Sequence, residues 1–479
     1  MSVARAEPAR SVDGRDAAAI AAAVAIAVVG GALVVRSTQL ALTMTLLLLL
    51  LAVRVQSRTA GLSLMWTYWL LAPFLRRVLD NSIGPVSPDP LSLLPFLATA
   101  LLAAIELRHT HLDKRARTIM TMGTVGLLIG APLGLAADPS AAGFAIFAYG
   151  TGLSAFILGW GDGQLRDGTG SLQKIVMYVL PILALYGLAQ YFFSLTSWDA
   201  HWVATTTLNS LGSPQEGHVR IFSTLNAPYT FAALLGTGLL LGLARRGRAG
   251  LAPAITALLV VALALTFMRS VWLGTVIGLI VFAAAARGRA AGRIVVVVGV
   301  CLFALIVVGN SNPTTKAFTE RVTSLGNPNE DRSAQERLAT TNKLFPVAVR
   351  QPLGEGAGQA GMASELTGSH GGSSALINVD DGYLSLMFQD GPFGFLLVIG
   401  ALVLSVGAAI KAVGAATEEE RQPRAALLAT LIMLLVALAA GDILFGLPGM
   451  MLWYLCGTAV AWASKSAARP TSAQPSRVR

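Results

Sequence analysis

The chain has 479 residues, of which 54% are hydrophobic and 13% are charged, and its mean hydropathy is +0.65. A soluble domain carries about 25% charged residues, so the composition excludes an ordinary soluble protein. The net charge of +10 comes mostly from short basic loops between apolar segments. This pattern indicates anchoring against anionic lipid and argues against nucleic acid as a partner.

Apolar segments follow one another along almost the whole chain after a polar start. Crossing a bilayer as a helix takes roughly 17–25 apolar residues, and lipid obliges the backbone to satisfy its own hydrogen bonds. We therefore predict an all-α polytopic membrane protein with about 12–14 transmembrane helices. The expected spans are 17–35, 38–53, 61–75, 91–105, 118–136, 142–160, 175–194, 227–244, 251–268, 271–286, 294–309, 393–410, 425–441 and 445–463.

The distribution of basic residues predicts the orientation of the spans. Lys and Arg collect in cytoplasmic loops. An arrangement with both termini in the cytoplasm places 24 of the 35 basic residues on that side. The first apolar segment is then a span that stays attached, not a cleaved signal peptide. The two cysteines, Cys301 and Cys456, lie in apolar segments and predict no disulfide framework.

This topology divides the chain into seven regions. Two long polar segments fall outside the membrane, and the second is expected to contain short helices at 331–349 and 381–388, separated by a Gly/Ser-rich stretch. Loops of this length are usually functional or disordered. In order, the regions are a disordered cytoplasmic tail (1–16), an N-terminal transmembrane bundle (17–194), an external loop (195–226), central transmembrane helices (227–309), a large external loop (310–391), C-terminal transmembrane helices (392–465) and a cytoplasmic tail (466–479).

Two arginines stand at the external ends of spans. Arg220 opens the segment RIFSTLNAP before the span at 227–244, and Arg269 lies in FMRSVWLG between two spans with almost no loop. An arginine beside apolar runs is costly unless it reaches the membrane surface or has a partner. One interpretation is a lipid-headgroup anchor. The other is a clamp for a lipid-linked diphosphate, because guanidinium binds phosphate oxygens bidentately and keeps its charge.

The carboxylates Asp380 and Asp381 precede Gly382 and Tyr383 at the end of the large loop. They can cap a helix, since Asp favours N-cap positions. A carboxylate held there can also accept a proton from a sugar hydroxyl as a general base. His370, the only histidine of this loop, is either a solvated loop residue or a second candidate base. Asp442 either ends a helix or lines a cavity.

Four segments, taken in order, resemble the O-antigen ligase/polymerase family of bacterial polysaccharide-assembling membrane enzymes. RIFSTLNAP resembles the family's Arg-then-ST-x-x-x-P stretch, and FMRSVWLG resembles its Arg-containing turn between spans. Arg337 followed by PLGEG resembles the loop helix with its Pro-Leu-x-Gly-x-Gly end. DDGYL with Gly391 and Gly394 resembles the His-Asn-x-x-Leu element that closes the loop. The resemblance covers about residues 175–445.

The resemblance implies glycosyl transfer without metal or cofactor on the external face of the bacterial inner membrane. The donor would be a glycan on polyprenyl diphosphate, the acceptor another glycan or a lipid-linked core, and other polysaccharide-assembly proteins are candidate partners. Arg220 and Arg269 would bind the diphosphate, with Arg337 as a further contact. The family's His-Asn pair falls on Asp380 and Asp381 here. This departure favours Asp380 over His370 as the base and a polymerase over a ligase.

Two other function classes fit a polytopic chain. A transporter or flippase of lipid-linked glycans would place polar sites near the bilayer midplane. Here the spans carry few charges, and the polar residues gather in the external loops, which favours an enzyme. A membrane scaffold would give the external arginines no role.

Overall fold

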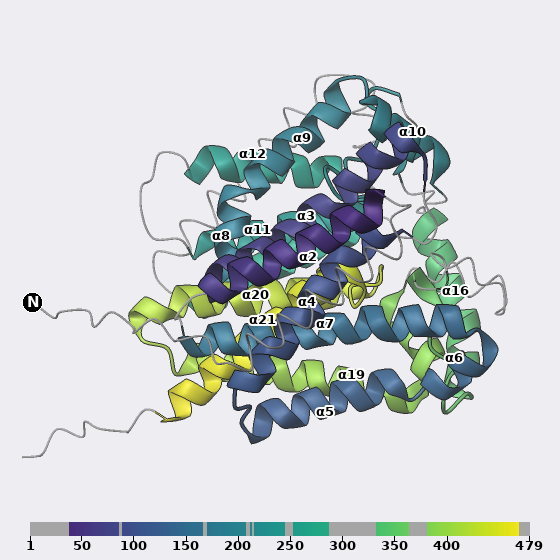
Figure 1. Ribbon diagram of the computed structural model, residues 1–479. Coiled ribbons are helices and arrows are strands. Elements are labelled where there is room, and N and C mark those ends of the chain that lie inside the picture. Colours follow the sequence, from purple (N-terminus) through teal and green to yellow (C-terminus); the bar gives the residue numbers. More distant parts are fainter. Residues whose placement is uncertain are drawn as a thin grey trace, which may run out of the picture. The chain divides into compact units, whose positions relative to one another are not determined.

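The computed structural model describes residues 38–85, 89–165, 170–206, 211–212, 215–244, 252–286, 332–362, 364 and 381–468. These residues form helices and no named strand, with one isolated antiparallel bridge between Gly212 and Val219. The all-α polytopic fold is therefore confirmed (Figure 1). The helices are α2 (Thr38–Gln56), α3 (Arg58–Ile83), α4 (Pro90–His109), α5 (Lys114–Leu128), α6 (Ala131–Ala137), α7 (Pro139–Leu165), α8 (Gly170–Tyr178), α9 (Leu180–Phe192), α10 (Ser197–Thr205), α11 (Pro228–Leu243), α12 (Ala252–Leu265), α13 (Arg269–Ala286), α16 (Arg332–Val349), α19 (Gly382–Gly414), α20 (Glu418–Leu438) and α21 (Gly446–Ala468).

Seven stretches of helix in the described residues are long and apolar enough to cross a membrane, or eight if the bent pair α8 and α9 counts as one span. Two further apolar helices, Pro228–Leu243 and Pro253–Leu265, are shorter. Each predicted span that falls on described residues is helical. The predicted spans at 17–35 and 294–309 lie outside the described residues, so the full count of 12–14 stays a prediction.

Two predicted spans are interrupted. The segment at 118–136 divides into α5 and α6 around Gly130, and that at 175–194 divides into α8 and α9, which are bent by 42°. Pro181 in the first turn of α9 explains the second break, because proline lacks the backbone N–H that a continuous helix needs. Pro392 follows a comparable kink in α19, where Gly391 has φ 67° and ψ 176°.

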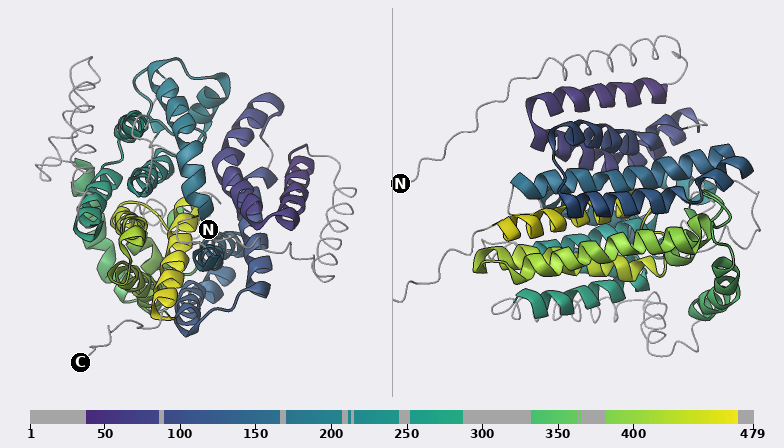
Figure 2. Two further views of the ribbon diagram at one scale, coloured as in Figure 1. Left: turned by 90° about the vertical axis from the view of Figure 1, so that its left-hand side faces the viewer. Right: turned by 90° about the horizontal axis from the view of Figure 1, so that it is seen from below.

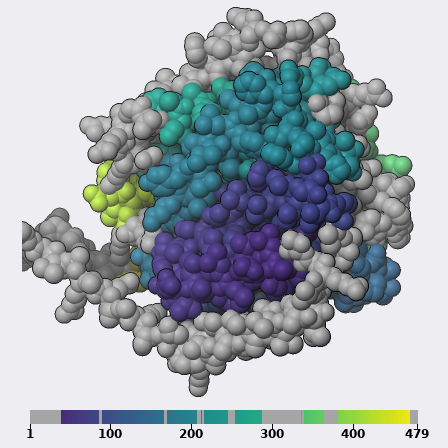
Figure 3. All heavy atoms as spheres, turned by 45° about the horizontal axis from the view of Figure 1, so that its top comes forward, coloured from purple at the N-terminus to yellow at the C-terminus, as the bar shows by residue number. Residues whose placement is uncertain are grey.

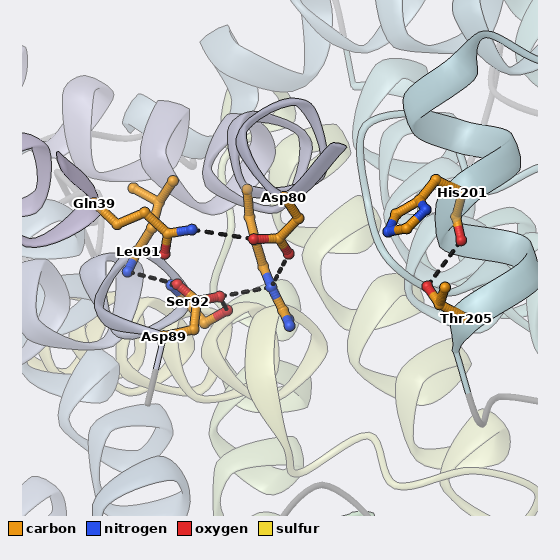
Figure 4. Close-up of polar contacts among 8 residues, drawn as sticks. Gln39, Asp80, Asp89, Leu91, Ser92, His201 and Thr205 are labelled. Atoms are coloured by element: carbon orange, nitrogen blue, oxygen red, sulfur yellow. Dashed lines mark hydrogen bonds and ion pairs between the residues drawn. The ribbon is translucent and has the colours of Figure 1, made fainter. Parts of the chain in front are cut away.

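The chain forms two compact units, Met1–Ala98 and Thr99–Arg479. In the first, α2 packs against α3, and a polar cluster ties their ends to the start of α4 (Figure 4). Asp80 accepts a hydrogen bond from Gln39 Nε2 at 3.0 Å. Arg76 lies 3.2 Å from Asp80 and 2.6 Å from Asp89. Asp89 also accepts from Ser92 Oγ. These contacts join α2 and α3 to the start of α4.

The second unit holds every predicted site residue. Most of its long helices run roughly alongside one another (Figure 2), and small residues let them pack closely. In α13, a Cβ added at Gly274 would lie 2.8 Å from the carbonyl oxygen of Met433, and one at Gly278 would lie 3.0 Å from that of Ala429. The two helices are therefore antiparallel, with α13 beginning where α20 ends.

Candidate active site

We call the end of the second unit that holds the C-terminus of α20 and the N-termini of α13 and α19 the distal end. It lies on the right in Figure 1, where α6, α10 and α16 are labelled. Two tyrosine hydroxyls donate to backbone carbonyls on the last turns of α20. Tyr229 donates to the carbonyl of Ala437 at 2.5 Å, and Tyr383 donates to that of Leu435 at 2.8 Å. The end of α20 is thus the point on which the sequence motifs converge.

The segment after Arg220 is buried, and its start is hydrogen-bonded to two other parts of the chain. The Arg220 N–H donates to Leu211 O at 2.9 Å, and the Ile221 N–H donates to Leu265 O at 3.3 Å. Ile221 and Phe222 are fully buried. Because Leu265 ends α12 four residues before Arg269, the backbones that carry the two arginines lie beside each other. The arginine side chains themselves are partly exposed.

The turn around Arg269 is as tight as predicted. Phe267 takes a left-handed conformation with φ 55°, and the Thr266 hydroxyl accepts from the Met268 N–H at 3.4 Å. Arg269 is the first residue of α13. A cation at a helix N-terminus adds to the positive end of the helix dipole, and this combination favours an anionic ligand. The α13–α20 register places Arg269 level with the residues around Ala437.

The DDGY motif begins α19 directly beside the end of α20. Asp381 is the N-cap of α19, and its Oδ1 accepts from the N–H groups of Tyr383 at 2.9 Å and Leu384 at 3.2 Å. A Cβ added at Gly382 would lie 2.8 Å from Gly441 O and 3.0 Å from Leu438 O. The helix-cap interpretation of Asp381 is therefore confirmed. It is compatible with a catalytic role for the residue before it.

Three sequence candidates are not placed by the structure. Asp380 and His370 lie outside the described residues. Arg337 belongs to α16, the predicted loop helix, but its side chain is also outside them. The structure therefore brings together the chain segments of Arg220, Arg269 and Asp381, and the roles of all six candidate residues remain proposals.

The PLGEG segment packs against α6 and α19 instead of simply ending α16. Glu355 N–H donates to Phe388 O at 2.7 Å, and Ala357 N–H donates to Gly130 O at 3.0 Å. Its glycines have positive φ, 74° at Gly354 and 117° at Gly356, where larger residues are strained. A side chain at Gly356 would also fall on the backbone of Gly134. The close backbone contacts of this motif fix the loop to the bundle, and we call residues 352–356 the PLGEG plug.

Replacing Gly356 with alanine is expected to destabilise the protein by about 3 kcal/mol or more, from steric overlap plus backbone strain. Thermal unfolding of the full chain in detergent measures this. The matched control is Gly143→Ala in α7, where an added Cβ meets nothing within 4 Å. That variant should be neutral or slightly stabilised. Equal melting temperatures for the two variants would contradict the close packing of the PLGEG plug against α6.

A polar cluster that sequence reasoning missed lies just below the start of α19. Tyr149 of α7 donates its hydroxyl to Asp442 in the α20–α21 turn. Gln389 Nε2 donates to Tyr149 Oη at 3.2 Å and to Ser385 Oγ at 3.1 Å, while Gln389 Oε1 accepts from the Gly358 N–H at 3.0 Å. Tyr149 and Gln389 are uncharged polar residues in apolar segments, so only the charge of Asp442 marked this cluster in the sequence.

The same residues line a small cavity with Leu127, Gly382, Leu386, Asp390 and Leu444. Of the two interpretations of Asp442, the cavity-lining one is confirmed. Burial raises the pKa of Asp442 from 3.8 to about 6, and hydrogen bonds from Tyr149 and from backbone N–H groups oppose that rise. A carboxyl group whose pKa is raised to about 6 can hold or release a proton close to physiological pH.

The raised pKa of Asp442 predicts a stability profile. The folded protein holds this proton more tightly than the unfolded chain does, so the group's favourable contribution is complete at low pH and is lost as pH rises from about 4 to about 6. The loss amounts to about 3 kcal/mol at most. Unfolding of wild type and Asp442→Asn between pH 4 and 7.5 measures it. The Asn variant should lose this part of the slope, whereas Glu418→Gln should retain it. An unchanged slope in Asp442→Asn would assign the proton elsewhere.

Within the described ranges, no group of three or more His, Cys, Asp or Glu side chains is placed to hold a metal ion.

Residues 254–399 match the family model described as O-antigen ligase. The matched region begins in α12, includes Arg269, α16 and the PLGEG plug, and ends within α19. A search of the curated proteins finds no match to the chain. Arg220 precedes the matched region, but its segment is joined to the region by the hydrogen bond to Leu265.

Proposed function

With the O-antigen ligase domain at residues 254–399, the chain belongs to the O-antigen ligase family, and we propose that it transfers a glycan from polyprenyl diphosphate to an acceptor hydroxyl on the external membrane face. Membership of the family supports glycan transfer in polysaccharide assembly as the activity of the chain. The observation that supports the finer proposal is the convergence of the Arg220, Arg269 and Asp381 segments at the distal end.

The proposed step exchanges one bond at the anomeric carbon. The acceptor oxygen bonds to that carbon while its bond to the diphosphate oxygen breaks, and the hydroxyl proton passes to a base. Arg220 and Arg269 stabilise the negative charge that develops on the leaving diphosphate, since positioned cations are most effective where charge forms. Arg337 is a proposed third contact with the diphosphate. No metal or cofactor enters this proposal.

We assign Asp380 as the base, because it directly precedes the N-cap of α19 at the distal end. His370 is the alternative base, and Asp381 is the residue that holds the start of the helix. The aspartate at the position of the family's histidine favours a polymerase, in which the acceptor is a second lipid-linked glycan. A lipid-linked core as the acceptor would make the chain a ligase.

The membrane location, the orientation and the partners of the protein are also part of the proposal. The protein lies in the inner membrane of a bacterium with both termini in the cytoplasm. It presents the distal end externally, which agrees with the basic residues at the opposite ends of α4 and α20, such as Arg108 and Arg421. Membrane lipid surrounds the bundle, and other polysaccharide-assembly membrane proteins are its proposed partners.

The test is an assay of the purified full chain in lipid nanodiscs with a polyprenyl-diphosphate-linked oligosaccharide and no ATP. We expect longer glycans and release of polyprenyl diphosphate. A parallel reaction with a lipid-linked core as acceptor separates polymerase from ligase. If instead the protein in liposomes moves the donor across the bilayer and forms no new glycosidic bond, the flippase alternative replaces the proposed function.

A further inference from the structure

A buried amide fixes the segment that carries Arg220. Gln190, near the end of α9, is 3% exposed. Its Oε1 accepts from the N–H groups of Ser223 at 2.7 Å and Phe222 at 3.3 Å. Its Nε2 donates to the carbonyl of the same Ser223 at 3.1 Å. One side chain therefore bonds to both N–H and C=O groups of a backbone segment that starts two residues after Arg220.

A buried carboxylate determines which way this amide points. Asp199 of α10 is fully buried, and its Oδ2 accepts from Gln190 Nε2 at 2.8 Å. An ionised carboxylate only accepts hydrogen bonds, so the NH₂ side of the amide must face it. The carbonyl side of Gln190 must then face Phe222 and Ser223. Tyr186 donates to the same Asp199 oxygen at 2.6 Å, which holds the carboxylate in place.

The backbone that Gln190 holds, at Phe222 and Ser223, has a conformation that needs such support. Ser223 has φ 55°, a left-handed conformation that is uncommon and costly for residues other than glycine. Its hydroxyl donates to Leu183 O at 2.7 Å, so α9 holds it at a second point. In the space-filling view of Figure 3, atoms coloured blue to teal, the colours of the middle of the chain, lie together on the face shown. Strained backbone held by buried hydrogen bonds is typical of segments that place a functional residue.

From this geometry we infer that Asp199 and Gln190 are positioning residues: the Asp199 carboxylate orients the Gln190 amide, which holds Phe222 and Ser223 so that Arg220 meets the diphosphate of the lipid-linked donor. The inference rests on the proposed function. It gives the external loop at 195–226 a specific task, because α10 supplies the carboxylate and the rest of the loop supplies the arginine. Neither residue contacts the diphosphate in this assignment.

The test is a double-mutant cycle on binding of a short-chain polyprenyl diphosphate to the full chain in nanodiscs. Asp199→Asn removes the charge and lets the Gln190 amide turn over. We expect it to weaken binding about tenfold, the effect of disrupting a charge-assisted hydrogen-bond pair. In an Arg220→Ala background it should cause no further loss, because coupled residues are not additive. In an Arg269→Ala background the two losses should multiply.

Matched controls separate positioning from folding. Gln190→Ala should behave as Asp199→Asn does, whereas Gln173→Ala, an amide in α8 that donates to Leu241 O, should bind the diphosphate normally. Tyr186→Phe keeps the Gln190–Asp199 bond and should cause a smaller loss in the same direction, so the idea stays testable if Asp199→Asn fails to fold.

The outcomes distinguish failure of the positioning role from failure of the proposed function. If Arg220→Ala weakens binding but Asp199→Asn does not, or if the Asp199→Asn loss persists undiminished in Arg220→Ala, the positioning role is wrong and the proposed function stands. If Arg220→Ala binds the diphosphate as tightly as wild type, the diphosphate role of Arg220 fails, and the positioning role fails with it.

Discussion

Arg269→Ala is expected to remove glycan transfer while leaving the protein inserted in the membrane at normal levels. The residue begins α13, where its charge adds to the positive end of the helix dipole, and the segment that follows Arg220 bonds to the turn just before it. Loss of one positioned group that stabilises developing charge costs about 10²–10³ in rate. The measurement is glycan product formed by the purified variant in nanodiscs.

Two comparison variants sharpen this result. Arg269→Lys keeps the charge but loses the bidentate geometry, so partial activity is expected. Arg108→Ala removes an exposed arginine from the opposite end of the bundle and should leave transfer unchanged. Wild-type transfer by Arg269→Ala would show that this arginine is only a lipid-headgroup anchor.

Asp380→Asn is expected to have a comparable effect for a different reason. Asparagine keeps the shape of the side chain but cannot accept the acceptor's proton, and general-base catalysis contributes about 10²–10⁴ in rate. We expect cells with this variant to make no polymer, and the purified protein to bind polyprenyl diphosphate with unchanged affinity. Binding without transfer distinguishes a missing base from a damaged diphosphate site.

Neighbouring residues provide the controls for the base. Asp381→Asn should retain folding and most activity, because asparagine caps a helix about as well as aspartate. His370→Ala should also retain activity. Wild-type polymer length with Asp380→Asn would exclude Asp380 as the base, and loss of transfer with His370→Ala would then move the assignment to the histidine.

The spans were predictable because lipid imposes one strong rule on the backbone. Segments such as 271–286 and 142–160 correspond to α13 and α7 within a few residues, since only a helix satisfies its own hydrogen bonds in hydrocarbon. The loop helix at 331–349 was equally readable, and it is α16. The break between α5 and α6 was not, because Gly130 is placed there by its contacts with Asp390 and Ala357, far away in the sequence.

The candidate site was predictable only in pieces. Arg220, Arg269 and the DDGY motif are conspicuous because charge next to apolar sequence is expensive and needs a reason. The residues that hold these pieces are not conspicuous. Tyr149, Gln190 and Gln389 are single polar residues within apolar helices, and Gln389 finds its tyrosine partner 240 positions away. No local pattern encodes such pairs.

The sequence by itself determined that the chain is helical and membrane-embedded, which residues lie at span ends and which carry charge, because hydropathy and charge cost are local properties. The tertiary structure alone decided that the end of α20 is the meeting point of α11, α13 and α19, that the glycines of PLGEG seal the loop against α6, and that Asp442 faces a cavity. These facts depend on close backbone approach and on hydrogen bonds between distant segments, which exist only once the helices have packed.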